Sequence, residues 1–123
     1  MILADTSVWI GHLRKHDATL ADLLEAGRIT THAFVVGELA LGNLRRREEI
    51  LGLLQDLPRS GQATDEEVLG FIARHRLSGA GIGYVDAHLL AATALTPGSR
   101  LWTFDRRLSA AAERLDLHVS RDR

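Results

Sequence analysis

The segment Ile2-Leu3-Ala4-Asp5-Thr6-Ser7-Val8-Trp9-Ile10 decides how the chain begins to fold. Its first residues are apolar, and Asp5, Thr6 and Ser7 end the run with residue types that favour helix N-caps. Val8, Trp9 and Ile10 then supply apolar side chains suited to a helix. The segment therefore predicts a short buried strand that leads directly into a helix, with a carboxylate at the junction.

The same order recurs near the end of the chain. Arg100-Leu101-Trp102-Thr103-Phe104 has the strongest strand character in the sequence, and Asp105 follows it. A helix is expected next, because apolar side chains follow at i, i+3, i+4 and i+7 from Leu108. Shorter strands are expected at residues 29–31, 57–62 and 117–119. Strands that alternate with helices predict an α/β fold whose parallel sheet is covered on both faces.

The helices between these strands are marked by periodicity and by capping residues. The sequence predicts a helix capped by Asp17 and ended at Gly27, a buried helix over residues 34–44, a half-exposed helix over residues 45–57, a helix from the capping box at Thr64 to Leu77, and a largely apolar helix over residues 84–95. Pro97 and Gly98 end the last of these.

Length and composition exclude several classes of protein. The chain has 123 residues, which fits one domain over residues 1–123, and no apolar run long enough to span a membrane. It has no cysteine, which rules out disulfides, cysteine-ligated metals and a cysteine nucleophile and suits the cytoplasm. Its 15 basic and 16 acidic residues and its pI of 6.6 argue against a protein that binds nucleic acid by bulk charge.

Acidic residues follow two of the predicted strands. Ligands of open parallel sheets bind beyond the carboxyl ends of the strands, and Asp5 and Asp105 both lie there. Each could instead serve only as an N-cap. Asp86 is similarly open to two interpretations, since a helix that starts at Gly83 would place it in a first turn, where the helix dipole favours a carboxylate.

Glu38 is harder to explain by local structure. It lies within residues 34–41, whose other side chains are apolar, so we expect it to be buried. A buried carboxylate needs a cation, which could be a metal ion or an arginine from residues 45–47. Four acids converging at one sheet edge would repel one another without cations, and their hard oxygen ligands favour Mg²⁺ or Mn²⁺. Such a site suits phosphodiester hydrolysis.

Four blocks of sequence carry a family resemblance: residues 4–10 (ADTSVWI), Glu38 with Gly42, residues 81–91 (GIGYVDAHLLA) and residues 101–108 (LWTFDRRL). In this order they resemble the blocks of PIN-domain ribonucleases and, more narrowly, of the VapC toxins of bacterial toxin–antitoxin pairs. The resemblance implies a three-layer α/β/α sandwich with a five-stranded parallel sheet of order 3-2-1-4-5. The chain differs from the family pattern at Asp116, where a helix-ending glycine is common in the family.

The resemblance also implies roles for single residues. Asp5, Glu38, Asp86 and Asp105 match the acidic quartet of the family. Asp5 and Asp86 would be metal ligands, Glu38 a ligand or a base that holds water, and Asp105 the most variable member. Hydroxyl groups of Thr6, Ser7 and Thr103 would orient the carboxylates. The implied activity is Mg²⁺- or Mn²⁺-dependent endoribonuclease cleavage of RNA by a toxin that forms homodimers and pairs with a VapB-like antitoxin.

Three other functions remain open at this point. A receiver-like signalling domain would also bind Mg²⁺ at strand ends, but it needs paired acids and a late lysine, whereas the only lysine is Lys15. A PIN-fold nuclease could act on DNA, and a catalytically idle binding module could keep the fold.

The role of His88 is open, and the arginines at residues 45–47 are expected to form a solvated face with Glu48 and Glu49. Removing four site acids from the sixteen leaves twelve against fifteen basic residues, a mildly basic remainder.

Overall fold

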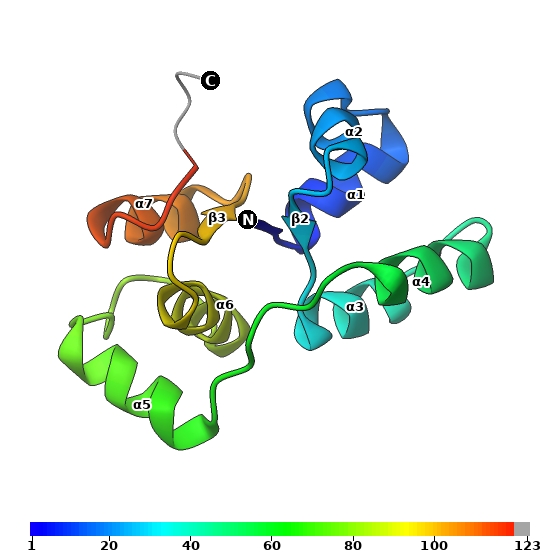
Figure 1. Cartoon of the computed structure of the whole chain (residues 1–123). Helices are drawn as coiled ribbons and strands as arrows, with labels where there is room; N and C mark the ends of the chain where they lie inside the picture. The colour runs from blue at the N-terminus through cyan, green and yellow to red at the C-terminus, as the bar shows by residue number, and fades with distance from the viewer. Residues whose placement is uncertain (120–123) are drawn as a thin grey trace.

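The computed structural model describes residues 1–119, so residues 120–123 of the expected domain lie outside it. The strands are β1 (Ile2–Ala4), β2 (Ile29–Thr30) and β3 (Arg100–Trp102), and the helices are α1 (Thr6–Arg14), α2 (Ala18–Glu25), α3 (Ala33–Ala40), α4 (Arg47–Asp56), α5 (Asp65–Arg74), α6 (Tyr84–Leu95) and α7 (Arg106–Arg114), as Figure 1 shows. In the described part of the chain, no helix has the length and apolar character needed to cross a membrane.

The sheet is parallel, with the strand order β2-β1-β3. All three residues of β1 are buried, as expected for a central parallel strand covered on both faces. Leu3 lies opposite Thr30 on one side and Leu101 on the other. The first and last strands of the chain are therefore neighbours, and the residues that follow them lie at the same edge of the sheet.

The expectation of five strands is wrong, because the sheet has three. The two expected outer strands are reduced to isolated parallel bridges, Thr31 with Arg59 and Leu101 with His118. Pro58 has no backbone N–H, which limits how far the first of these segments can pair. The outer segments still flank β2 and β3 in the expected spatial order.

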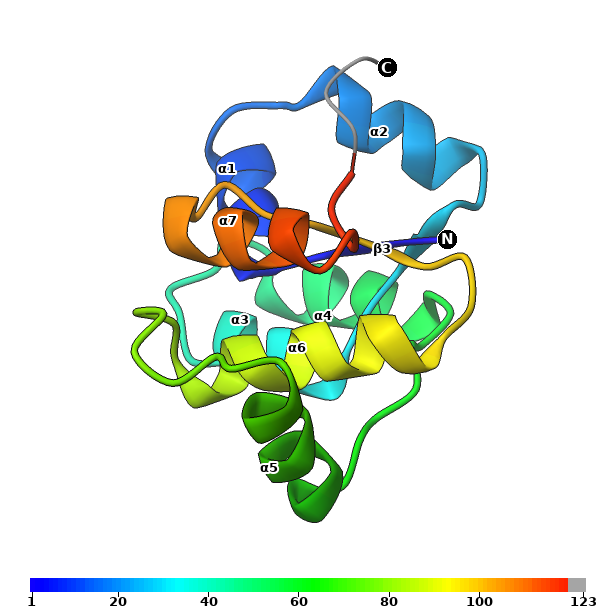
Figure 2. The same cartoon turned by 90° about the vertical axis from the view of Figure 1, so that its left-hand side faces the viewer.

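Helices cover both faces of the sheet, which matches the expected layering. Figure 2 shows α1 and α2 above the strands, α7 in front of them, and α3, α4, α5 and α6 below them. The centre of α6 is the most enclosed helical segment, since every side chain from Ala87 to Thr93 is buried. The helix α5 packs on α6 and forms an outer part of that layer.

The expected helices at residues 34–44 and 45–57 have different ends in the structure. The helix α3 stops at Ala40, and the backbone N–H of Gly42 turns back to Leu39 at 3.1 Å. The side chain of Leu41 is 90% exposed. Arg46 has a left-handed backbone with φ of 52°, and α4 begins only after it. Apolar composition alone therefore overestimated the length of the buried helix.

Candidate active site at the carboxyl edge of the sheet

Asp5 occupies the junction between β1 and α1. It is 5% exposed, and its Oδ1 accepts hydrogen bonds from the backbone N–H of Val8 at 3.2 Å and from Ser7 Oγ at 2.6 Å. The first bond makes Asp5 the N-cap of α1. Asp5 thus initiates a helix and also presents a carboxylate beyond the end of the central strand.

Ser7 and Thr103 connect the ends of β1 and β3. The hydroxyl of Thr103 donates to Asp5 Oδ2, and Ser7 Oγ accepts from the backbone N–H of Phe104 at 2.9 Å. Thr103 Oγ1 also accepts from the backbone N–H of Asp105 at 3.0 Å. These bonds fix the orientation of the Asp5 carboxylate and tie two acids to the same turn.

Burial raises the pKa of Asp5 above its usual value. Hydrogen bonds from Ser7, Thr103 and the backbone N–H of Val8 act in the opposite direction, because they stabilise the ionised form. The pKa is raised on balance, so the loss of hydration on burial has a larger effect than the hydrogen bonds to the carboxylate. A cation beside Asp5 would offset the cost of keeping this carboxylate ionised.

Asp86 lies in the first turn of α6, and its Oδ2 accepts from the backbone N–H of Gly83 at 3.0 Å. Its pKa is raised mainly by burial. The Gly83 bond lowers the pKa, and the negative charges of Asp105, Asp5 and Glu38 raise it. Asp86 therefore feels the charge of each of the other three predicted site acids, which come from three separate segments of the chain.

Asp105 is exposed, and its Oδ1 accepts from the backbone N–H of Leu108 at 2.9 Å. It is consequently the N-cap of α7, just as Asp5 is the N-cap of α1. Both residues cap a helix and also lie at the edge of the sheet, where a site residue was expected. The two positions coincide because a strand that leads directly into a helix puts the capping residue at the sheet edge.

The expected burial of Glu38 is wrong, since the side chain is exposed. It lies next to Gly37 on the solvent side of α3, while Val35, Val36 and Leu39 are buried. In residues 1–119 no arginine or lysine forms an ion pair with it. Its partner is Thr6, whose Oγ1 donates to Glu38 Oε1 at 2.6 Å. Thr6, Ser7 and Thr103 therefore all hydrogen-bond to predicted site acids.

The carboxylate oxygens of these acids are chemically suited to bind a divalent cation. Asp86, Asp105 and Glu38 each use one carboxylate oxygen in the hydrogen bonds above, which leaves the second oxygen of each as a hard ligand of the kind that Mg²⁺ and Mn²⁺ prefer. Across the described residues, no three acidic or histidine groups stand close enough to ligate one ion together. Because Glu38 and Asp105 are exposed, rotation of their side chains could complete such a site.

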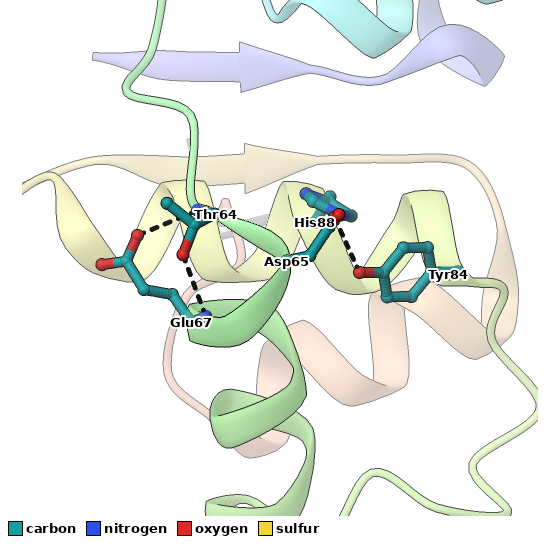
Figure 3. A network of polar contacts seen from close by, with 5 residues as sticks. All are labelled: Thr64, Asp65, Glu67, Tyr84 and His88. Carbon is teal, nitrogen blue, oxygen red and sulfur yellow. Dashed lines mark hydrogen bonds and ion pairs between the residues drawn. The ribbon is translucent and has the colours of Figure 1, made fainter.

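The side chain of His88, whose role the sequence left open, is buried and faces α5 (Figure 3). Its Nε2 lies 3.4 Å from Asp65 Oδ1, and its ring contacts the rings of Phe34 and Tyr84 edge-on. Tyr84 donates to the same Asp65 oxygen at 3.0 Å. His88 thus helps to join α6 to α5.

Two polar features of this region were missed by the sequence interpretation. The capping box of Thr64 and Glu67 was expected, but the bond from Tyr84 to Asp65 was not, since nothing in their spacing signals it (Figure 3). His32 is buried and caps α3, with its Nδ1 accepting from the backbone N–H of Phe34 at 3.0 Å. Burial, with the nearby charges of His88 and Arg59, lowers the pKa of His32 to about 4.

A parallel sheet between helical layers, with four acids at its carboxyl edge, defines the class of PIN-domain proteins, and the family model for the PIN domain matches residues 2–114. The chain belongs to the PIN-domain family. Its curated relatives include two proteins named Ribonuclease VapC32, from Mycobacterium tuberculosis strains CDC 1551 / Oshkosh and ATCC 25618 / H37Rv. Each is 50% identical over 111 residues, which cover 90% of this chain and 90% of the relative. Within its family the chain is therefore of the VapC type, as its sequence blocks indicated.

Proposed function

We propose that the protein is an endoribonuclease that depends on Mg²⁺ or Mn²⁺ and acts as the toxin of a toxin–antitoxin pair. The observation that carries the proposal is the environment of Asp86, whose pKa is raised first by burial and further by the charges of Asp105, Asp5 and Glu38. Acids gathered in this way are stabilised by divalent cations. The name of the VapC32 relatives supports RNA as the substrate. The family match gives the receiver-like alternative no support.

The side chains divide the work of hydrolysis among them. Asp5 and Asp86 would hold the ion, because they are the two most enclosed acids of the quartet. A bound divalent ion supplies positive charge to the phosphodiester and lowers the pKa of a water molecule. Glu38, whose Oε1 accepts a hydrogen bond from Thr6, would accept a proton from the attacking water at Oε2. Asp105 adds a fourth carboxylate at the exposed side.

Protein partners follow from the VapC type and from the surface of the chain. We propose a VapB-like antitoxin and a second copy of the chain as partners, acting in the cytoplasm, for which a chain without cysteine is suited. Exposed apolar side chains offer area for such contacts, with Leu41 90%, Leu69 60% and Leu53 59% exposed.

The test is cleavage of RNA by the purified chain, free of antitoxin, with Mg²⁺, with Mn²⁺ and with EDTA. Asp5→Asn and Asp86→Asn should each abolish metal-dependent cleavage. Asp17→Asn is the matched control, because Asp17 also caps a helix through the backbone N–H of Leu20 but lies outside the quartet. Equal cleavage by Asp86→Asn and wild type, or cleavage in EDTA, would overturn the mechanism. A parallel arm with single-stranded DNA tests the alternative substrate.

A further inference from the structure

An open hollow of about 730 Å³ lies between α7 and the segment that joins α5 to α6. Four arginines line it, Arg76, Arg106, Arg107 and Arg114, together with small side chains such as Ser78 and Ala110. None of its lining residues is acidic. The hollow therefore combines a concentration of positive charge with room for a ligand, in a chain whose formal net charge is −1.

Within residues 1–119, no acidic side chain forms an ion pair with the arginines of the hollow. The ion pairs found within residues 1–119 are His88 with Asp65 and Arg100 with Asp116, so none of the four takes part in one. Arg106 and Arg107 also lie in the first turn of α7, where the helix dipole disfavours cations. Helix stability therefore does not explain why Arg106 and Arg107 occupy these positions. An anionic ligand would offset both their unfavourable interaction with the helix dipole and the repulsion between the arginines.

Contacts with the backbone position two of the four arginine side chains. A Cβ built on Gly81 would stand 2.8 Å from Cδ of Arg107, so the Arg107 side chain lies directly across the Gly81 backbone. Arg114 donates to the backbone carbonyl of His75 at 2.9 Å and thereby holds the end of α7 against the end of α5. The hollow is thus fixed by contacts on both of its walls.

The hollow adjoins the acid cluster. Arg106 and Arg107 directly follow Asp105, and Gly81 stands two residues before Gly83, whose N–H binds Asp86. In Figure 2 the start of α7 and the segment before α6 both lie on the left of the molecule. A polyanion held in the hollow would consequently extend to the four acids.

We propose that this hollow binds the phosphodiester backbone of the RNA on one side of the bond to be cleaved. The proposal rests on the proposed function and adds to it a substrate-binding surface. Arginine suits the task, because its planar guanidinium can donate two parallel hydrogen bonds to a phosphate. The metal-free acid cluster repels phosphate, so attraction beside it holds the RNA where the acids can act. An acidic peptide would have no reason to reach those acids, which favours RNA.

The test measures binding of a fluorescent oligouridylate to the Asp86→Asn protein in EDTA over a series of salt concentrations. In this background, Arg106→Gln combined with Arg107→Gln should weaken binding. The double variant should also make the slope of log K against log salt shallower by about 1.4, since each lost contact to a single strand accounts for about 0.7. Arg14→Gln combined with Arg28→Gln is the matched control, because both arginines are exposed and lie outside the lining of the hollow.

Three outcomes separate this proposal from the proposed function. An unchanged slope in the Arg106/Arg107 double variant overturns the hollow as an RNA site, even if wild type cleaves RNA with Mg²⁺. A shallower slope in a protein that never cleaves RNA supports the hollow and removes the nuclease function. Competition by polyglutamate as effective as that by unlabelled oligouridylate overturns RNA as the occupant in favour of an acidic peptide.

Discussion

Thr6 Oγ1 lies 2.6 Å from Glu38 Oε1 and joins the first residue of α1 to the solvent side of α3. Glu38 is exposed, and a free glutamate side chain samples many rotamers. The hydrogen bond limits that freedom through one carboxylate oxygen and leaves the second oxygen outside the bond. Thr6 is therefore a positioning residue in the proposed reaction, and it acts through Glu38.

Thr6→Val should lower kcat for RNA cleavage about tenfold or more, because it keeps the shape of the side chain and removes the donor to Glu38. Thr6→Ser keeps a hydroxyl and should restore most of the rate. Steady-state cleavage with Mg²⁺ gives the comparison, and KM for RNA should change little. A Thr6→Ser variant as slow as Thr6→Val would show that the hydroxyl is not what matters.

Binding of Mg²⁺ or Mn²⁺ should raise the Tm of the chain, since a ligand that binds only the folded state stabilises it by about 2.7 kcal/mol at about one hundred times Kd. Asp5→Asn should abolish this shift. Its metal-free Tm should be no lower than that of wild type, because asparagine keeps the N-cap of α1 and removes a buried charge. Thermal denaturation with and without metal measures both effects.

Asp17→Asn serves again as the control, since it should leave the metal-dependent shift intact. Asp5→Ala adds a second comparison. It loses the cap as well as the charge, so its metal-free stability should fall by about 1 kcal/mol below that of Asp5→Asn. A full metal shift in Asp5→Asn would contradict the assignment of Asp5 as a ligand.

The pattern of strands and helices was largely predictable because its signals are local. Capping residues Asp5, Asp17, Thr64 and Asp105 each begin the helix that the sequence indicated. The number of strands was not predictable in this way, because pairing depends on backbone groups of other segments. Residues 57–62 and 117–119 were each expected to form a strand, but each segment makes a single bridge. Asp116 adopts a left-handed backbone with φ of 57°, so the position keeps the conformation for which glycine is common.

The candidate site was predictable to a different degree at each residue. Strand-to-helix junctions placed Asp5 and Asp105 at one edge, and the structure agrees. Glu38 was identified as an unusual acid within an apolar segment, but the inference that it is buried was wrong. Composition does not show which side of a short helix faces the solvent. The arginine hollow escaped notice because Arg76 and Arg107 are far apart in sequence and meet only in the fold.

His32 should make folding stability depend on pH. Its ordinary pKa is 6.5, and burial lowers it to about 4 in the folded chain. Below about pH 6.5 the unfolded chain takes up a proton on this ring that the folded chain rejects, so stability present above that pH is lost as the pH falls toward 4. The contribution lost from about pH 7 to about pH 5 is about 2 kcal/mol.

His32→Asn should remove that dependence while keeping a side-chain acceptor for the backbone N–H of Phe34. Urea unfolding of wild type and variant at the two pH values measures it. The variant can be less stable overall, because it also loses the ring contact with Phe34. The decisive quantity is the change with pH, and equal changes in the two proteins would refute the role of His32.

Gly81→Ala should weaken RNA binding, because the new Cβ would lie within 3 Å of Arg107 and displace that side chain from the hollow. It also strains a backbone with φ of +79°. Gly98→Ala is the matched control, since Gly98 has φ of +78° with no atom near its Cβ position. Both variants should lose about 1 kcal/mol of folding stability. Binding of oligouridylate in EDTA should fall for Gly81→Ala alone.

The single bridges at either side of the sheet limit how this molecule can assemble. A strand from another chain needs a row of free N–H and C=O groups along an edge. Segments 58–60 and 117–119 instead pair with Thr31, next to β2, and with Leu101 of β3, and Pro58 contributes no donor to an incoming strand. The segments beside the sheet therefore hinder its growth from one molecule into the next. The proposed antitoxin and second copy would then contact this protein through helix surfaces, where Leu41, Leu53 and Leu69 face the solvent.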